Sequence, residues 1–383
     1  MLLQSKLPNI GTSIFTTMSK MAADHQAINL SQGFPNFDCN PKIIDLMQKH
    51  MREGHNQYAP MAGLMLLRER LAQKYVNLYH STYNPDTEIT ITTGATQAFY
   101  TCMSAFVGFG HEVILFDPCY DSYEPSVLVH GGIAKFVHLS PHNDFAYDWA
   151  AAQNLISAKT KAIVVNSPNN PTGSVLTQSD VETLIKIIEK NPHILVISDE
   201  VYEHIVFDEN KHISLSHFDE LKDNLLVISS FGKTYHTTGW KVGYLLANEK
   251  LTNEFRKVHQ FTVFSVNTPA QFAFADLLED EAMYLELPDF YAQKRHYFSQ
   301  QLKNSKFGLK ACKSTYFQLV DYSSINNNLD DLAFTHWLIR DVGVAAIPLS
   351  AFYHTKTDYK MLRLCFAKTE QTLHDAAQKL IKI

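Results

Sequence analysis

Several features that would assign a protein to a particular class are missing from this chain of 383 residues. Basic residues are not in excess, because 39 acidic residues outnumber 33 lysines and arginines and give a net charge of −6. Such a charge provides no basic surface for nucleic acid or for an anionic membrane. No apolar run is long enough to span a bilayer. We therefore expect neither nucleic acid nor a membrane among its partners.

Cysteine pairs at metal-binding or redox spacing are also missing. The five cysteines are scattered, and no two of them form a Cys-x-x-Cys motif, which is typical of reduced thiols in a reducing compartment. Residues 1–6 lack the apolar core of a signal peptide. These observations predict a cytoplasmic protein. The 18 histidines are dispersed along the chain, so we expect no metal site.

The sequence does contain a regular alternation of predicted strands and helices, which predicts an α/β fold with a mostly parallel central sheet covered by helices. No Gly-x-Gly-x-x-Gly motif follows a first strand, which argues against a nicotinamide oxidoreductase. The predicted strands are 88–93, 112–116, 135–139, 161–166, 194–199, 224–229 and 242–247. The predicted helices are 41–52, 63–79, 96–107, 121–130, 147–157, 177–190 and one long region at 249–281.

The remainder of the chain has a different pattern, and its length calls for a second domain. A polar helix at 287–304, shorter strands near 315–321 and 361–366 and a terminal helix indicate a smaller α+β unit. We expect a large domain over 41–285. Residues 1–40 and 286–383 would form the small domain, with a hinge near 285–288.

The run 226–235 contains the most informative lysine. A buried strand ends in a Ser-Ser pair, and Lys233 follows after a glycine. Asp199 closes a second apolar strand, and Asn170 lies in the turn after a third. Because ligands of such sheets bind beyond the carboxyl ends of the strands, we expect these three side chains to lie together. An amine that forms an imine, an acid for a pyridine nitrogen and an amide are the groups that hold a pyridoxal cofactor.

A phosphate group would need further donors. Residues 93–97 end a strand and begin a helix, so the backbone N–H groups of Ala95 and Thr96, after Gly94, could bind an anion. An ordinary strand-to-helix turn is the alternative. Ser230 and Lys241 could add a hydroxyl and a cation, although Lys241 could also be a surface lysine.

Two further groups leave alternatives open. Tyr202 follows Asp199 closely and could donate to a cofactor oxygen, whereas Asp199 could instead cap a helix. Arg363 has apolar residues on both sides, and a buried arginine needs an anionic partner. That partner could be a substrate carboxylate, bound bidentately, or the carboxylate of a structural ion pair.

Taken together, these motifs resemble the class I aminotransferases, which belong to fold type I of the pyridoxal phosphate enzymes. Within them, the chain is similar to the kynurenine aminotransferase, glutamine transaminase K and methionine aminotransferase group. The matching stretches occur in the family order along almost the whole chain. They are SQGFPNF at 31–37, NQY at 56–58, SPNNPTG at 167–173, DEVY at 199–202, GKT at 232–234, GWKVG at 239–243 and RLCF at 363–366.

The resemblance implies a role for each matching residue. Lys233 would be the Schiff-base lysine and the base that moves the substrate proton, with Asp199 and Tyr202 as the other catalytic groups. The implied cofactor-binding residues are Lys233, Asp199, Asn170, Tyr202, Gly94, Ala95, Thr96, Tyr120, Ser230, Lys241 and, from the partner of a homodimer, Tyr58. The implied substrate-binding residues are Arg363, Gly33, Asn170, Phe15, Tyr58, Tyr120 and the partner's Phe264. A cis Asn170–Pro171 bond is also implied.

Departures from the family pattern concern the substrate. Many class I members carry arginine in place of Lys241, and the glutamine transaminases carry tryptophan where Phe15 aligns and histidine where Ser265 aligns. The resemblance implies ping-pong transfer of an amino group to a 2-oxo acid. We expect apolar, thioether or aromatic donors (methionine, phenylalanine, tyrosine, kynurenine or glutamine) rather than aspartate. A carbon–sulfur β-lyase of the same fold is the main alternative, and a cofactor-binding regulator without turnover is a more distant one.

Overall fold

The computed structural model describes residues 4–383. Residues 1–3, on which part of the expectation about a signal peptide falls, lie outside the described residues. Within residues 4–383, we find no helix that combines the length and the apolar character needed to cross a membrane.

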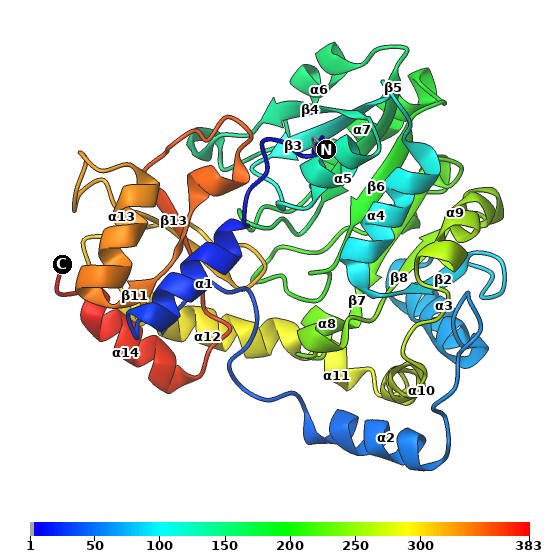
Figure 1. Cartoon of the computed structure of the whole chain (residues 1–383), viewed down its shortest axis with the longest axis horizontal. Coiled ribbons are helices and arrows are strands. Elements are labelled where there is room, and N and C mark those ends of the chain that lie inside the picture. The colour runs from blue at the N-terminus through cyan, green and yellow to red at the C-terminus, as the bar shows by residue number, and fades with distance from the viewer. Residues whose placement is uncertain (1–3) are drawn as a thin grey trace.

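A seven-stranded sheet forms the centre of the molecule (Figure 1). Its strand order is β2-β8-β7-β6-β5-β3-β4, and only β8 runs antiparallel to its neighbours. The predicted mostly parallel sheet is therefore confirmed. The strands are β2 (Ile89–Thr92), β3 (Glu112–Asp117), β4 (Ile133–His138), β5 (Thr160–Asn166), β6 (Leu195–Asp199), β7 (Leu225–Ser230) and β8 (Gly243–Ala247).

Helices cover both faces of this sheet because its inner strands are apolar on both sides. In β5, Ala162 and Val164 belong to one core cluster, whereas Ile163 and Val165 belong to the other. The first face is covered by α4 (Gly94–Phe106), α5 (Tyr123–Val129) and α9 (Glu249–Thr262). The second is covered by α3 (Met65–Tyr79), α6 (Trp149–Leu155), α7 (Gln178–Lys190) and α10 (Thr268–Leu277).

The prediction of one long helix at 249–281 is wrong, because the chain breaks between α9 and α10. Phe264 has a φ of 67°, outside the helical region. The Asn267 side chain accepts from the N–H of Ala270, and Pro269 occupies the first turn of α10. Proline lacks the N–H that a continuous helix requires, and an asparagine cap begins a new helix.

The segments outside the large sheet form a second, smaller set of elements, on the left in Figure 1. A four-stranded antiparallel sheet has the order β12-β13-β10-β9. Its strands are β9 (Gly308–Leu309), β10 (Phe317–Asp321), β12 (Ile347–Pro348) and β13 (Met361–Cys365). The short strand β1 (Ile28–Asn29) pairs with β11 (Val344–Ala345). The helices are α1 (Ile14–Asp24), α12 (Leu287–Gln301), α13 (Asp331–Trp337) and α14 (Glu370–Leu380).

The pairing of β1 with β11 joins the beginning of the chain to its last third. This pairing supports the proposed division into 41–285 and the two flanking segments, which stays a prediction. The remaining helices are α2 (Pro41–Arg52), α8 (Phe231–Thr234) and α11 (Ala282–Leu285).

Candidate active site

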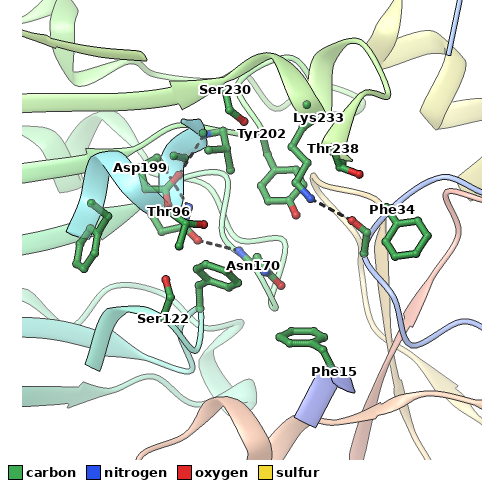
Figure 2. Close-up of a pocket in the computed structure, with 18 of the residues that line it drawn as sticks. Phe15, Phe34, Thr96, Ser122, Asn170, Asp199, Tyr202, Ser230, Lys233 and Thr238 are labelled. Atoms are coloured by element: carbon green, nitrogen blue, oxygen red, sulfur yellow. Dashed lines mark hydrogen bonds between the residues drawn. The ribbon is translucent and has the colours of Figure 1, made fainter. Parts of the chain in front are cut away.

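A cavity of about 340 Å³ lies at the carboxyl ends of the parallel strands, between the large sheet and the smaller set of elements. Figure 2 shows Asp199, Thr96 and Ser230 on the sheet side of this cavity, with Phe15 and Phe34 on the opposite side. The cavity brings together most of the site residues expected from the sequence. These are Phe15, Gly33, Gly94, Ala95, Thr96, Tyr120, Asn170, Asp199, Tyr202, Ser230, Lys233, Lys241 and Arg363.

Lys233 lies on the single helical turn α8, directly after β7. A Cβ atom on Gly232 would lie 3.0 Å from the backbone of Thr238, so any larger residue would push these chain segments apart, and glycine favours the close approach that holds this turn. The Lys233 Nζ donates to the carbonyl of Gly33 at 3.0 Å (Figure 2). Burial lowers the pKa of Lys233 to about 8, and the positive charges of Arg363 and Lys241 act in the same direction.

Asp199 ends β6 and is buried beneath the cavity. Burial raises the pKa of this carboxyl to about 6, although a hydrogen bond from Tyr123 opposes that rise. The Tyr123 hydroxyl donates to Asp199 Oδ2 at 2.5 Å. The backbone carbonyl of Asp199 accepts from Asn166 Nδ2 at 2.9 Å. The backbone N–H of Val201 donates to the other carboxylate oxygen, Oδ1, at 3.3 Å. Both carboxylate oxygens are therefore held, and the carboxylate does not act as a helix cap, since β6 leads into a turn.

The beginning of α4 and the side chain of Lys241 form a site suited to an anion. Gly94, Ala95 and Thr96 form the first turn of this helix of 13 residues. A Cβ atom on Gly94 would lie 3.4 Å from Lys241 Nζ, so the ammonium group is close to the helix N-terminus. Ser230 lines the same part of the cavity. Free N–H groups, the helix dipole and a cation together favour a phosphate.

Arg363 is fully buried in β13, with 0% of its surface exposed. Its Nη1 donates to Asn170 Oδ1 at 2.7 Å and its Nη2 to the Ser31 carbonyl at 2.9 Å. The guanidinium lies 3.9 Å from the ring centroid of Phe317 and 5.1 Å from that of Phe15. Burial lowers its pKa to about 10.

The alternative of a structural ion pair for Arg363 does not agree with the structure, because no carboxylate within residues 4–383 lies within 4.0 Å of the guanidinium. The buried Nε also has no hydrogen-bond partner. A desolvated cation with unused donors is suited to an anionic ligand that enters from the cavity.

Asn170 and Tyr202 lie between these groups. The backbone N–H of Asn170 donates to Asn166 Oδ1 at 3.0 Å, and the Asn170–Pro171 bond is cis, as expected. The Tyr202 ring centroid is 5.6 Å from Lys233 Nζ. Burial raises the pKa of Tyr202, so its hydroxyl keeps its proton and can donate a hydrogen bond.

Two of the expected site residues, Tyr58 and Phe264, do not line the cavity of their own chain. They are 80% and 57% exposed, and their rings meet edge to face with centroids 5.1 Å apart. Their assignment to the site of a partner subunit stays a prediction.

Sequence reasoning missed several residues of the site. Tyr316 donates from its hydroxyl to the Gly33 carbonyl at 2.7 Å, so it holds the same oxygen that Lys233 contacts. The regular alternation of a strand at 315–321 could have indicated that Phe317 faces inward. No local signal distinguishes the others. The missed residues are Gln32, Phe34, Phe99, Ser122, Tyr123, Asn166, Val201, Gly232, Thr238, Val242, Tyr316 and Phe317.

The fold and the cavity define the class: this is a fold type I transferase, with a partly buried lysine at the carboxyl end of a central strand. The family model described as aminotransferase class I and II matches residues 25–380. The chain belongs to this family and is an aminotransferase. Members of the family generally depend on pyridoxal phosphate.

Known relatives are similar over almost the whole chain. Methionine aminotransferase of Escherichia coli (strain K12) is 49% identical over 378 residues, which cover 98% of this chain and 97% of that protein. Kynurenine–oxoglutarate transaminase 1 of Homo sapiens is 31% identical over 411 residues, with 98% and 97% covered. A crystal structure from Escherichia coli, reported with a methionine aminotransferase function, has a TM-score of 0.97 at 48% identity and covers 100% of both chains.

Proposed function

We propose that this aminotransferase binds pyridoxal 5′-phosphate in the cavity and transfers the amino group of an apolar, thioether or aromatic amino acid to a 2-oxo acid. One observation carries the proposal. The buried guanidinium of Arg363, which has no carboxylate partner among residues 4–383, shares the cavity with the Lys233 amine. A substrate carboxylate at Arg363 would therefore hold an amino acid next to the base.

The residues of the cavity fit the cofactor. The first turn of α4, Ser230 and Lys241 provide donors for a phosphate. Asp199 provides a buried negative charge for a protonated ring nitrogen, and such a cation would lower the carboxyl pKa from its raised value. When bound, the cofactor supplies an aldehyde for the amine and an electron-withdrawing ring that acidifies the substrate Cα proton.

Lys233 is suited to both acceptance and release of a proton. An ordinary lysine has a pKa near 10.4 and is almost fully protonated at neutral pH. With a pKa of about 8, a larger fraction of Lys233 is neutral and able to accept the Cα proton. The Gly33 carbonyl holds the amine in the cavity, and Tyr316 holds that carbonyl. The proton then returns from the same nitrogen to a neighbouring carbon, so no second base is needed.

Substrate preference follows from the charges that line the cavity. Arg363, Lys233 and Lys241 are its only basic residues within the described chain. The cofactor aldehyde would engage Lys233, and the cofactor phosphate would engage Lys241. Arg363 is then the one guanidinium in the cavity that remains for substrate carboxylates. The aromatic rings of Phe15, Phe34 and Phe317 also line the cavity. An apolar side chain would gain contact there, whereas a second carboxylate would be desolvated without a partner.

A panel of amino donors tests this preference. With one common 2-oxo acid, we expect methionine or an aromatic donor to exceed aspartate in kcat/KM by at least about tenfold, because one misplaced charge costs more than about 1.4 kcal/mol. Methionine, phenylalanine, tyrosine, kynurenine, glutamine and aspartate form the panel. A result in which aspartate is the best donor contradicts the proposed preference, although the aminotransferase activity would stand.

The proposal includes a homodimer with shared active sites. Tyr58 and Phe264 form an exposed aromatic pair, and Phe261 is 87% exposed. Exposed aromatic groups of this kind are typical of interfaces. If Tyr58 acts in the partner's site, a mixture of Lys233→Ala and Tyr58→Ala subunits restores activity, because each mixed dimer contains one intact site. No recovery after the subunits are mixed and exchanged would show that Tyr58 does not act in the partner's site.

A further inference from the structure

Two histidines and a glutamate form a cluster at the end of α2, separate from the cavity residues. His50 lies in the last turn of α2 and is only 4% exposed, and Glu53 is the C-cap of this helix. The backbone N–H of His55 donates to the His50 carbonyl at 3.1 Å. Gly54 adopts a φ of 91° between them, which favours glycine. This tight turn brings the His55 ring to within 5.3 Å of the His50 ring, centroid to centroid.

Three potential ligand atoms of this cluster have the spacing that a metal ion requires. His50 Nδ1 is 3.2 Å from His55 Nδ1 and 3.4 Å from Glu53 Oε2. All three atoms lie within 4.8 Å of one another. In a tetrahedral zinc site with metal–ligand distances of about 2.0–2.1 Å, neighbouring ligand atoms are separated by about 3.3 Å. The two distances from His50 Nδ1, 3.2 and 3.4 Å, therefore match the ligand spacing of such a site closely.

Asp276, at the end of α10, fixes the orientation of His50. Its Oδ2 is 2.9 Å from His50 Nε2, and Lys49 Nζ lies 3.6 Å from the same oxygen. An ionised carboxylate only accepts hydrogen bonds, so Nε2 donates and Nδ1 presents a lone pair toward His55 and Glu53. A carboxylate that accepts from the second ring nitrogen is the usual support of a metal-binding histidine. Phe272 stacks on both rings and fixes their planes.

Two acceptor atoms of the cluster face each other at its centre. With Nε2 protonated, the lone pair of His50 Nδ1 faces the carboxylate oxygen of Glu53 at 3.4 Å. Two acceptors at this distance repel each other unless a proton or a cation lies between them. We propose that His50, Glu53 and His55 bind one divalent transition-metal ion of the zinc type. Glu53 is exposed and His55 is partly exposed, so water completes the coordination.

This site departs from the expectation that the chain has no metal site. The ligands occur as His-x-x-Glu-x-His across a helix end, and the supporting carboxylate is 226 residues away from His50. A bound ion joins the end of α2 to the loop that leads to Tyr58. Through the hydrogen bond of His50 with Asp276 it is also connected to α10, which lies beside α2 in Figure 1.

Zinc titration of the cofactor-loaded protein, without a histidine tag, tests the proposal by calorimetry. We expect one Zn²⁺ per chain at this cluster. His55→Ala removes a ligand on a partly exposed turn and weakens binding at least about tenfold. Asp276→Asn removes the orienting carboxylate and weakens binding by about 10–100-fold. His193→Ala, at an exposed position, is the matched control and leaves binding unchanged. Substitution with Co²⁺ gives the absorption bands of a tetrahedral ion.

Several results would overturn the proposal. If zinc is not taken up, or if His55→Ala and His193→Ala bind it equally, the ion does not belong to this cluster. Equal binding in all variants would place the zinc ion elsewhere, on the cofactor or on other side chains.

Discussion

Two buried cations of this molecule, Lys74 and Arg363, differ in whether a carboxylate lies beside them. Lys74 in α3 is 6% exposed and lies 2.9 Å from Glu203 Oε1. The carboxylate also accepts from Tyr79, Tyr244 and Ser229 at 2.5–2.9 Å. Lys74 and these hydrogen bonds lower the pKa of Glu203 in spite of its burial.

Arg363, by contrast, is 0% exposed and donates only to two neutral oxygens. Burial of either cation costs several kcal/mol unless an anion compensates it. The Lys74 charge is compensated within the fold and stabilises the contact of α3 with the turn that follows β6. The Arg363 charge awaits an anion from outside the chain. The comparison separates a cation that is paired within the fold from one that, on the proposed function, binds a substrate carboxylate.

The largest expected effect concerns Lys233, another basic residue of the cavity. We expect Lys233→Ala to lower kcat for methionine by more than about 10³-fold, because the amine is the only base in position to move the Cα proton. The free energy of unfolding should stay close to that of the parent, since the amine has one hydrogen bond, to the Gly33 carbonyl. Single-turnover absorbance with methionine measures the loss. Turnover at the parent rate would contradict the role of Lys233.

Substitution of Lys74 should lower the stability of the protein and leave its activity nearly unchanged. Lys74→Met leaves the Glu203 carboxylate buried without its cation, and we expect the free energy of unfolding to fall by about 3–5 kcal/mol. Urea titration measures this loss, and kcat/KM per folded molecule should remain within about twofold. The double variant Lys74→Met/Glu203→Gln is the control, because it removes both charges and should recover most of the stability. A single variant as stable as the parent would contradict a structural role for the pair.

Arg363→Met is the matched test on the ligand-binding side. We expect kcat/KM for methionine to fall by about 10²-fold, equivalent to about 3 kcal/mol, because the substrate carboxylate loses its charged partner. The free energy of unfolding should fall by less than about 2 kcal/mol, because only two hydrogen bonds to neutral oxygens are lost while a desolvated charge is removed. If Arg363→Met destabilises the protein as much as Lys74→Met, the comparison between the two cations fails.

The residues of the cavity and the Lys74–Glu203 pair also differ in how far the sequence could predict their positions. Lys233, Asp199 and Asn170 each follow an apolar strand, and the carboxyl ends of parallel strands meet at one edge, so their proximity was predictable. Arg363 was singled out by its apolar neighbours, but its contact with Asn170 could not be predicted from local sequence, because 193 residues separate the two. The Lys74–Glu203 pair was not predicted, since 129 residues separate its members and the helical pattern of α3 does not give the helix's rotation.

Local signals were also missed. The break between α9 and α10 is encoded by Asn267 and Pro269, a cap and a helix-starting proline, but the apolar pattern on both sides suggested continuity. The hydrogen bond from Tyr123 to Asp199 has no such signal, because it depends on how α5 packs against β6.

The smallest expected effect tests that hydrogen bond. Asp199 already has a pKa of about 6, raised by burial and opposed by Tyr123. Tyr123→Phe removes a donor to the ionised form, and a hydrogen bond to a charged group contributes about 1.5–3 kcal/mol. The pKa should therefore rise further, by about one pH unit or more.

A carboxyl with a raised pKa takes up protons on folding, so ionised Asp199 costs stability as the pH rises through its folded pKa. On the proposed function, activity needs the ionised form, and the ring cation of the cofactor would lower the Asp199 pKa in parent and variant alike. The acid limb of Tyr123→Phe should therefore lie closer to neutral pH than that of the parent. The pH dependence of kcat/KM measures this shift. Tyr353→Phe is the control, because that buried hydroxyl donates to the Leu139 carbonyl at 2.7 Å and does not contact Asp199. An acid limb that moves equally in both variants, or in neither, would contradict the assignment of the shift to the Asp199 carboxyl.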